Sequence, residues 1–170
     1  GQDTTRYRLQ RLKKHKVITT CYPAIDFGRL GFQKFRVFFV VDERRPEKRK
    51  AFIDALIAHP NTRLVMEYSD RWDFEWALVA KTLQGFDKIL HDVVKEHEGV
   101  IQEKITLAEI RAFRATVAPY EYKFKLKEIP HHNDYKHDEK DLHILSALSE
   151  DSRLSTYKIA ETVDLSADAI

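Results

Sequence analysis

The middle of the chain alternates between hydrophobic patterns typical of strands and of helices. Aromatic and β-branched side chains fill residues 34–41, 63–68 and 73–80, and each run predicts a strand. Residues 100–113 alternate more loosely and predict a last, long strand. Apolar residues recur at helical spacing in two segments, which contain Phe52, Ile53, Leu56 and Ile57, and Phe86, Ile89, Leu90, Val93 and Val94. The predicted order is β-α-β-β-α-β, the ferredoxin-like order of an α+β protein.

This order predicts a sheet with helices on one face and a second face that is open. Trp72, Phe74 and Trp76 are expected to make the open face apolar. Two-fold pairing is the simplest way to bury such a face, so we expect a homodimer or a higher assembly. Residues 69–71 between two of the strands predict a tight hairpin connection.

A basic segment precedes this domain. Arg and Lys gather between residues 6 and 16, where there is no Asp or Glu. Leu9 and Leu12 form a narrow apolar stripe that predicts a short helix with both leucines in the core. Residues 17–20 are rich in β-branched side chains and predict an extended segment. Two interpretations are open: a solvated cationic helix, or the end of a DNA-facing helix with a strand behind it.

The C-terminal part returns to helical spacing after a polar connector. In the connector, aromatic and lysine residues alternate from Tyr120 to Lys127, which predicts an edge strand. His131 and His132, which follow, are expected to be solvated rather than metal-bound. An apolar stripe then predicts one helix (Leu142, Ile144, Leu145 and Leu148), Ser155 is placed to cap a second, and Ser166 a third. This pattern predicts a helix-turn-helix, with an unrelated helical hairpin as the alternative.

Composition narrows the protein class. Among the 170 residues, 43% are hydrophobic and 33% are charged, which excludes a disordered or collagen-like chain. The longest apolar stretch, residues 37–41, is too short to cross a bilayer, so no membrane partner is expected. Cys21 is the only cysteine, which favours a cytoplasmic protein. Because the net charge is only +2, any affinity for nucleic acid must come from local clusters of charge.

The C-terminal segment resembles the opening of the helix-turn-helix in the Lrp/AsnC (feast/famine) transcriptional regulators. The resemblance rests on Asp141, Ile144, Leu145, Leu148, Asp151, Arg153, Ser155, Ile159, Ala160, Val163, Leu165 and Ser166. Residues 5–18 resemble the other end of that module. The residues after Phe32 resemble the effector-binding, dimerising domain of the family, mainly in topology and in Trp72-Asp73.

The resemblance implies a ferredoxin-like sensor and dimerisation domain flanked by partial (winged) helix-turn-helix segments. The expected boundaries are 1–22 for the end of a first helix-turn-helix, 33–116 for the sensor, 117–137 for the connector and 138–170 for the start of a second helix-turn-helix. The implied function is transcription regulation without catalysis or a cofactor. The expected partners are double-stranded DNA, a second copy of the chain and, as a candidate effector, an amino acid.

The order of these parts is unusual for the family, which places one helix-turn-helix before one sensor. Laying residues 1–5 over residues 166–170 joins the two partial segments into one module, with Asp3 on Asp168. We therefore expect tandem regulator units, of which this chain is about one repeat. The alternative is that both ends are those of a cut fragment.

The helix-turn-helix interpretation assigns DNA-contacting residues. The N-terminal part of the third helix reads base edges, and flanking cations and amides hold phosphates. In the first module, this predicts base contacts for Gln2, Asp3 and Thr4, and phosphate contacts for Arg6, Arg8, Lys13 and Lys14. In the second module, the corresponding residues are Ser155, Thr156, Tyr157, Ser166 and Asp168.

The resemblance also assigns an effector site. In the family, a glycine in the hairpin precedes an aromatic–acid pair near the dimer interface where amino acids bind. Here Asp70 stands where that glycine is expected, and the predicted effector-binding residues are Asp70, Arg71, Trp72 and Asp73. A side chain at position 70 could close or recharge the pocket, so a purely structural interface is the alternative.

Two other function classes share the fold. Siroheme decarboxylases resemble Lrp/AsnC proteins and bind a tetrapyrrole between the two domains. His15, His59, His91 and His97 are candidate axial or acid–base groups in that interpretation, but no spacing singles one of them out. The basic segment fits DNA better. The other class is a partner-binding protein that kept the fold and lost regulation.

Overall fold

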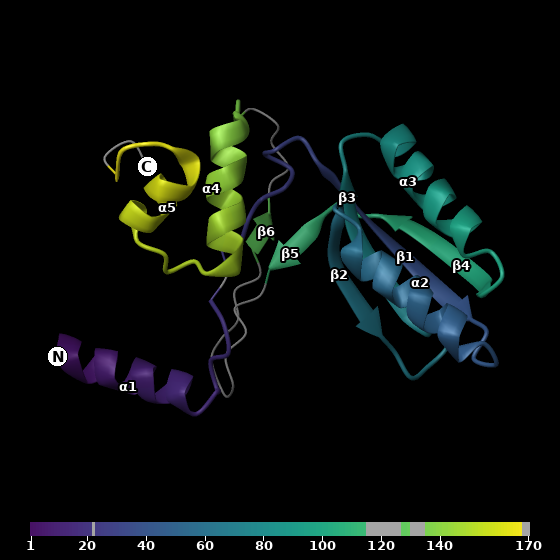
Figure 1. The fold of residues 1–170 in the computed structure, drawn as a ribbon, viewed down its shortest axis with the longest axis horizontal. Helices are drawn as coiled ribbons and strands as arrows, with labels where there is room; N and C mark the ends of the chain where they lie inside the picture. Colours follow the sequence, from purple (N-terminus) through teal and green to yellow (C-terminus); the bar gives the residue numbers. More distant parts are fainter. Residues whose placement is uncertain (22, 115–126, 130–134, 168–170) are drawn as a thin grey trace. The chain divides into compact units, whose positions relative to one another are not determined.

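The computed structural model describes residues 1–21, 23–114, 127–129 and 135–167 (Figure 1). The chain divides into two compact units, one formed by residues 26–135 and the other by residues 1–25 together with residues 136–170. In the described part of the chain, no helix is long and apolar enough to cross a membrane.

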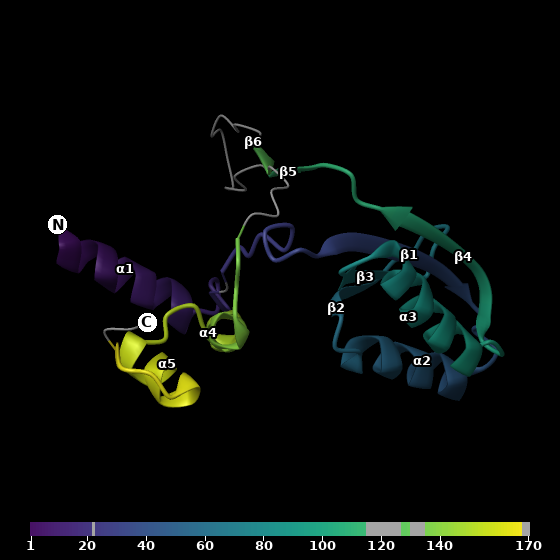
Figure 2. The ribbon, with the colours of Figure 1, turned by 90° about the horizontal axis from the view of Figure 1, so that it is seen from above.

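The unit of residues 26–135 contains a four-stranded antiparallel sheet with two helices on one face (Figures 1 and 2). Its elements are β1 (Gln33–Val41), α2 (Pro46–Ala58), β2 (Thr62–Glu67), β3 (Phe74–Ala80), α3 (Leu83–Glu96) and β4 (Ile101–Ala108). The strand order is β2-β3-β1-β4. The predicted ferredoxin-like α+β fold is therefore confirmed.

The core lies between the sheet and the two helices. Val37 pairs with Trp76 across β1 and β3, and both side chains are fully buried. Phe39 meets the Phe52 ring of α2 edge to face, with 5.0 Å between centroids, and Phe35 stacks on Phe86 of α3 at 4.1 Å. The aromatic side chains thus fix both helices against one face of the sheet.

The prediction that Phe74 and Trp76 form the open face is wrong. Phe74 is 2% exposed and Trp76 is 0% exposed, and both belong to the core beneath the helices. β3 is buried on both faces, so the alternation of its side chains does not reveal which set faces the helices. Pairing of Trp76 with Val37 decides this, because directly paired residues share a face.

The helix-free face is apolar, as expected, but other residues make it so. Phe38 lies at its centre, with the rings of Tyr68 and Trp72 at 6.2 and 6.0 Å. Around them, exposed apolar side chains come from the edge strands β2 and β4: Leu64, Met66, Ile105 and Leu107. Of the three aromatic residues assigned to this face, only Trp72 contacts it.

The last predicted strand is shorter than expected. β4 ends at Ala108, where the Glu109 amide still donates to the carbonyl of Lys34. Three residues later, β5 (Ala112–Arg114) pairs with β6 (Lys127–Ile129) in a separate two-stranded sheet. Of the expected edge strand from Tyr120 to Lys127, only Lys127 is described, as the first residue of β6; His131 and His132 also lie outside the described residues.

The other unit contains the helices α1 (Gln2–Lys14), α4 (Glu139–Glu150) and α5 (Thr156–Val163). Its two chain segments meet at a hydrogen bond of 3.1 Å from the Ser152 amide to the carbonyl of Cys21. The helices α1 and α4 were predicted from apolar stripes, and α5 was predicted from its cap, Ser155. The domain boundaries drawn from the sequence remain predictions.

Candidate nucleic-acid interface

The helix α4 begins at a reciprocal cap. The Asp138 carboxylate accepts from the Asp141 amide at 2.9 Å, and the Asp141 carboxylate accepts from the Asp138 amide at 3.0 Å. Both acids, with Glu139, lie where the helix dipole favours negative charge. The start of α4 is therefore set by local sequence.

The helix α5 is capped as predicted. The Ser155 hydroxyl accepts from the amide of Lys158 at 3.4 Å. Ile159, Ala160 and Val163 form the buried side of the helix, which packs against α4. The helix ends at Asp164, whose φ of 52° and ψ of 53° place it in the left-handed region and turn the chain sharply. The predicted two helices and the turn after the second are thus present.

The predicted contact residues of this module lie at the start of α5 and beyond its end. Thr156 and Tyr157 occupy the first turn and are exposed, Tyr157 at 73%. The hydroxyl of Ser155 is engaged as the helix cap. Ser166 is exposed after the turn, and Asp168 lies outside the described residues, as does most of the predicted third helix.

The basic helix α1 is almost entirely exposed. Leu9 is half-buried and Leu12 is 41% exposed, so the prediction of two core leucines is wrong. A stripe of two leucines on a 13-residue helix buries too little apolar area to hold the helix against a core. Within the described residues, none of Arg6, Arg8, Lys13 and Lys14 makes a salt bridge.

Residues 17–20 do not form the predicted strand; they follow a helix-ending turn. Lys16 adopts a left-handed φ of 54°. Its amide donates to Lys13, and the amides of Val17 and Ile18 donate to the carbonyl of Leu12. These hydrogen bonds satisfy the carbonyls of Leu12 and Lys13 at the end of α1. Helix ends of this kind usually have glycine at the position with the left-handed φ. Local hydrogen bonding at the helix end therefore overrides the β propensity of Val17 and Ile18.

Helical geometry separates the predicted DNA contacts of α1. Residues 4, 8 and 11 positions apart share a side of a helix, so Gln2, Arg6, Gln10 and Lys13 form one stripe. Asp3 and Lys14 border that stripe. Arg8 lies on the other side of the helix. The structure therefore groups Gln2, Arg6 and Lys13 and sets Arg8 apart from them.

The predicted effector residues form the hairpin between β2 and β3. The Asp73 carboxylate accepts from the Val41 amide at 2.7 Å and so ties the hairpin to β1. Asp70 accepts from the Trp72 amide at 3.2 Å and keeps a negative φ, so this turn does not need the glycine of the family pattern. Arg71 lies over the Trp72 ring at 5.0 Å and pairs with Glu103 at 3.3 Å.

A buried ionic cluster on the helix-free face was missed by sequence reasoning. Glu75 of β3 is 1% exposed, and its two carboxylate oxygens accept from Arg36 of β1 and from the hydroxyl of Tyr68. The hydrogen bond to Glu75, with burial, raises the pKa of Tyr68 above its ordinary value. An acid inside an otherwise apolar strand was the available signal, but only the register brings Arg36 near it.

Three of the four candidate histidines stand at helix ends, and the fourth is exposed on a helix. His15, His59 and His97 stand at the C-terminal caps of three different helices. The ring of His59 packs against Trp76 at 5.6 Å, and burial lowers the pKa of His59. His91 is exposed on α3. In the part of the chain that the structure describes, no group of metal-ligating side chains gathers.

Comparisons with known proteins agree with this geometry. Residues 138–170 match the AsnC-type helix-turn-helix domain family. No curated protein sequence gives a significant match. An AsnC family transcriptional regulator from Agrobacterium tumefaciens is 15% identical, and the match covers 66% of this chain and 72% of that chain with a TM-score of 0.56.

Two further solved structures share the fold. A transcriptional regulator from Neisseria meningitidis, solved in complex with L-Met, is 13% identical over 65% of this chain and 71% of that chain, with a TM-score of 0.55. The siroheme decarboxylase NirDL, solved with an iron-uroporphyrin III analogue, is 12% identical over 99% of this chain and 49% of that chain, with a TM-score of 0.62. This chain spans about half the length of NirDL.

At these sequence identities, the structural matches establish only the fold. The family match identifies residues 138–170 as similar to an AsnC-type helix-turn-helix. The ferredoxin-like unit and the capped helix pair are two of the parts that the sequence resemblance implied. Residues 138–170 thus resemble the AsnC-type helix-turn-helix domain, and the chain shares its fold with a solved AsnC family transcriptional regulator.

Proposed function

We propose that this chain is a DNA-binding transcription regulator of the Lrp/AsnC type that acts as a dimer. The observation that carries the proposal is the match of residues 138–170 to the AsnC-type helix-turn-helix, on a helix pair whose caps and turn fit that motif. This function makes catalysis unnecessary, and the protein is proposed to be a regulator rather than an enzyme.

The basic helix α1 is proposed to contact DNA as well. Its stripe of Gln2, Arg6 and Lys13 combines an amide that can pair with a purine and cations that can hold phosphates. These cations have no carboxylate partner in the described part of the chain, so binding phosphate would break no ion pair. The tandem arrangement of regulator units stays a prediction.

The helix-free face of the sheet is proposed as the dimer interface. Leu64, Met66, Ile105 and Leu107 are between 39% and 47% exposed around Phe38. A second copy would remove these side chains from water and thereby stabilise the assembly. Sedimentation at micromolar concentration tests this: a monodisperse monomer would contradict it.

The hairpin residues Asp70, Arg71, Trp72 and Asp73 are proposed to face an amino-acid effector. The fold shared with a regulator solved in complex with L-Met supports this proposal. The guanidinium of Arg71, 73% exposed, can meet a carboxylate. Asp73 would act indirectly, since its carboxylate already holds the backbone of β1.

DNA binding is tested by its dependence on salt. Duplexes are selected from a random pool, and their Kd is then measured by fluorescence anisotropy at several salt concentrations. If Arg6, Lys13 and Lys14, which lie on or beside the α1 stripe, contact phosphates, affinity should fall with roughly the 2.7 power of salt concentration. Replacing two of them, in the variant Arg6→Gln/Lys13→Gln, should lower that exponent by about 1.8.

The matched control is Lys88→Gln/Lys95→Gln on α3, which removes the same charge outside the proposed interface. The salt exponent of this control variant should equal that of the wild-type protein. A flat response to salt would contradict DNA binding and favour a partner-binding protein. An equal loss of slope in the control would contradict the role of α1.

A siroheme decarboxylase is the second candidate, because the fold match to NirDL extends over 99% of this chain. The test is to add iron uroporphyrin III to the protein and record the absorption spectrum, beside a mobility-shift assay with the selected DNA. A red-shifted, saturable Soret band without a DNA shift would favour the enzyme. A DNA shift without a Soret change would favour the regulator.

A further inference from the structure

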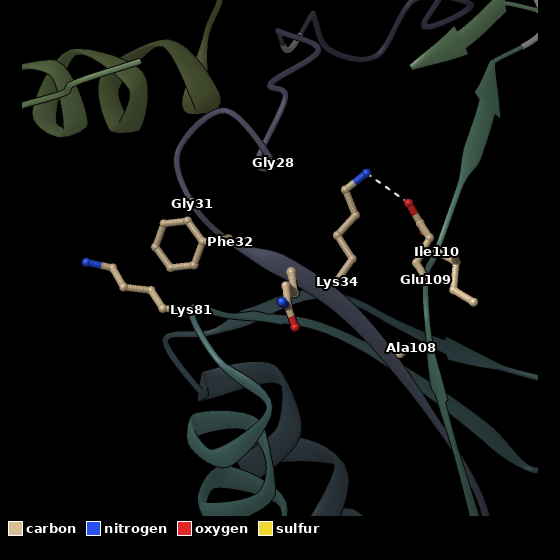
Figure 3. Close-up of a pocket in the computed structure, with 9 residues that line it drawn as sticks. Gly28, Gly31, Phe32, Lys34, Lys81, Ala108, Glu109 and Ile110 are labelled. Atoms are coloured by element: carbon tan, nitrogen blue, oxygen red, sulfur yellow. Dashed lines mark hydrogen bonds and ion pairs between the residues drawn. The ribbon is translucent and has the colours of Figure 1, made fainter. Parts of the chain in front are cut away.

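Ion pairs neutralise many of the charges in the unit of residues 26–135. At the cavity shown in Figure 3, for example, Lys34 and Glu109 point toward one another and pair at 3.0 Å. The unit that contains α1, α4 and α5 differs. Within the described residues, no cation of α1 makes an ion pair, and neither Glu139 nor Glu150 of α4 does. These charges are therefore available to a partner.

The two parts of this unit carry opposite charge. With histidine neutral, residues 1–16 contain six basic side chains and one acidic side chain, a net charge of +5. Residues 138–167 contain seven acidic side chains and three basic ones, a net charge of −4. The charges therefore favour contact between α1 and the pair of α4 and α5. They also leave the helix pair, by itself, with a charge that repels DNA.

Both parts expose an apolar side chain on one side of a helix. Leu12 of α1 is 41% exposed and Leu142 of α4 is 38% exposed, and neither helix contains a buried residue. An amphipathic helix is stable in a globular protein because its apolar side is covered. Each of these two helices therefore lacks part of a packing partner.

Charged residues border the two leucines. Arg8 lies four residues before Leu12, on the same side of α1 and away from the stripe proposed to contact DNA. Glu139 lies three residues before Leu142 and Glu150 eight residues after it, so these three share a side of α4. A leucine beside a cation on one helix thus matches a leucine between two carboxylates on the other.

Within one chain, neither of these surfaces is covered. The segment that follows α1 is tied to the turn between α4 and α5 by the hydrogen bond from the Ser152 amide to the carbonyl of Cys21. With this bond in place, Leu12 and Leu142 of the same chain both remain exposed. A second copy can supply the missing surface, and two-fold symmetry lets each copy give its α1 and receive the other's.

We propose that α1 of one copy packs on α4 of a second copy. Arg8 and Leu12 form the contact on the first copy, and Glu139, Leu142 and Glu150 form it on the second. The inference rests on the proposed function only in that two copies must meet. This contact brings the cations of the DNA-facing stripe beside the acidic helix pair, so that a composite module, rather than the helix pair alone, meets DNA.

Cross-linking between two single-cysteine variants of the full chain tests this contact. Cys21→Ser/Leu12→Cys and Cys21→Ser/Leu142→Cys carry tags of different size and are mixed, without DNA, in oxidised glutathione. A disulfide that joins the two tags reports only contact between copies. It should form at least about tenfold faster than the disulfide with Cys21→Ser/Tyr7→Cys in place of the first variant, because contact raises the local concentration of the thiols. Tyr7 is the matched control, since it is 65% exposed on another side of α1.

Charge reversal gives a second readout. Arg8→Glu, added to the chain with Leu12→Cys, should slow the cross-link about tenfold, because an attraction becomes a repulsion at an exposed site. Adding Glu139→Lys/Glu150→Lys to the other chain should restore the rate, since opposite charges then face each other again. Circular dichroism checks that every variant keeps its helices.

Three results would overturn the proposal. They are equal rates for Leu12→Cys and Tyr7→Cys, no rescue by the second reversal in folded variants, and an internal disulfide only in a chain that carries both Leu12→Cys and Leu142→Cys.

A mobility-shift assay with the selected DNA separates this inference from the proposed function. DNA binding without the cross-link overturns the inference and leaves the proposed function intact. The cross-link without DNA binding supports the inference and contradicts the proposed function.

Discussion

The ion pair between Arg36 and Glu75 predicts an asymmetric response to mutation. The Glu75 side chain is 1% exposed, whereas that of Arg36 is 46% exposed. Arg36→Met would leave a buried carboxylate with only the Tyr68 hydroxyl as donor, at a cost of about 3 kcal/mol in unfolding free energy, the lower end for a broken buried pair. Glu75→Gln would leave a guanidinium that water can reach, at a cost of about 1–2 kcal/mol.

The double variant Arg36→Met/Glu75→Gln separates these terms. It removes both charges, so it should be more stable than Arg36→Met by about 1 kcal/mol or more. The assay is urea unfolding followed by tryptophan fluorescence, at two protein concentrations because the cluster lies on the proposed dimer face. Equal losses in the two single variants, or a double variant no better than Arg36→Met, would refute the reasoning.

Three further predictions concern local structure. Asp138→Ala should lower the unfolding free energy by about 1 kcal/mol, because α4 loses a cap, and Asp138→Asn should recover most of it; a loss in neither would contradict the capping role. Lys16→Gly should increase the helical circular dichroism signal of α1, since glycine tolerates the left-handed φ of 54°, while Lys16→Ala should not. The pKa of Tyr68 in the folded state is raised above 10, so the stabilisation from the neutral hydroxyl is complete below pH 10 and is lost as the pH rises further. Urea unfolding at several alkaline pH values should therefore show a smaller loss of stability in Tyr68→Phe than in the wild type. Identical pH profiles for the two proteins would contradict this.

The local hydrophobic pattern predicted most of the helices and strands. It did not predict which other parts of the chain would cover them. The helical spacing of Phe52 and Leu56 predicted α2, and both residues are buried beneath the sheet. The same argument failed at Leu12, because a stripe predicts which side of a helix is apolar and not whether anything covers it. At residues 17–20, propensity failed because the end of α1 supplies competing hydrogen bonds.

In the candidate sites too, contacts between neighbouring residues could be predicted from the sequence, whereas contacts between distant residues could not. The caps at Asp138 and Ser155 involve residues three positions apart and could be recognised directly. The engagement of Asp73 with Val41 joins residues 32 positions apart, so no local pattern could reveal that its carboxylate is already used. The ion pair of Lys34 with Glu109 likewise joins residues 75 positions apart.

The sequence by itself determined the element order, the helix caps and the resemblance to a helix-turn-helix, because each depends on residues a few positions apart. Only the tertiary structure decided that Trp76 faces the helices, that Glu75 is buried against Arg36, and that Lys34 pairs with Glu109. These outcomes depend on strand register, and a shift of one residue would exchange the two faces of β3. Register is set by the whole core, which no short stretch of sequence contains.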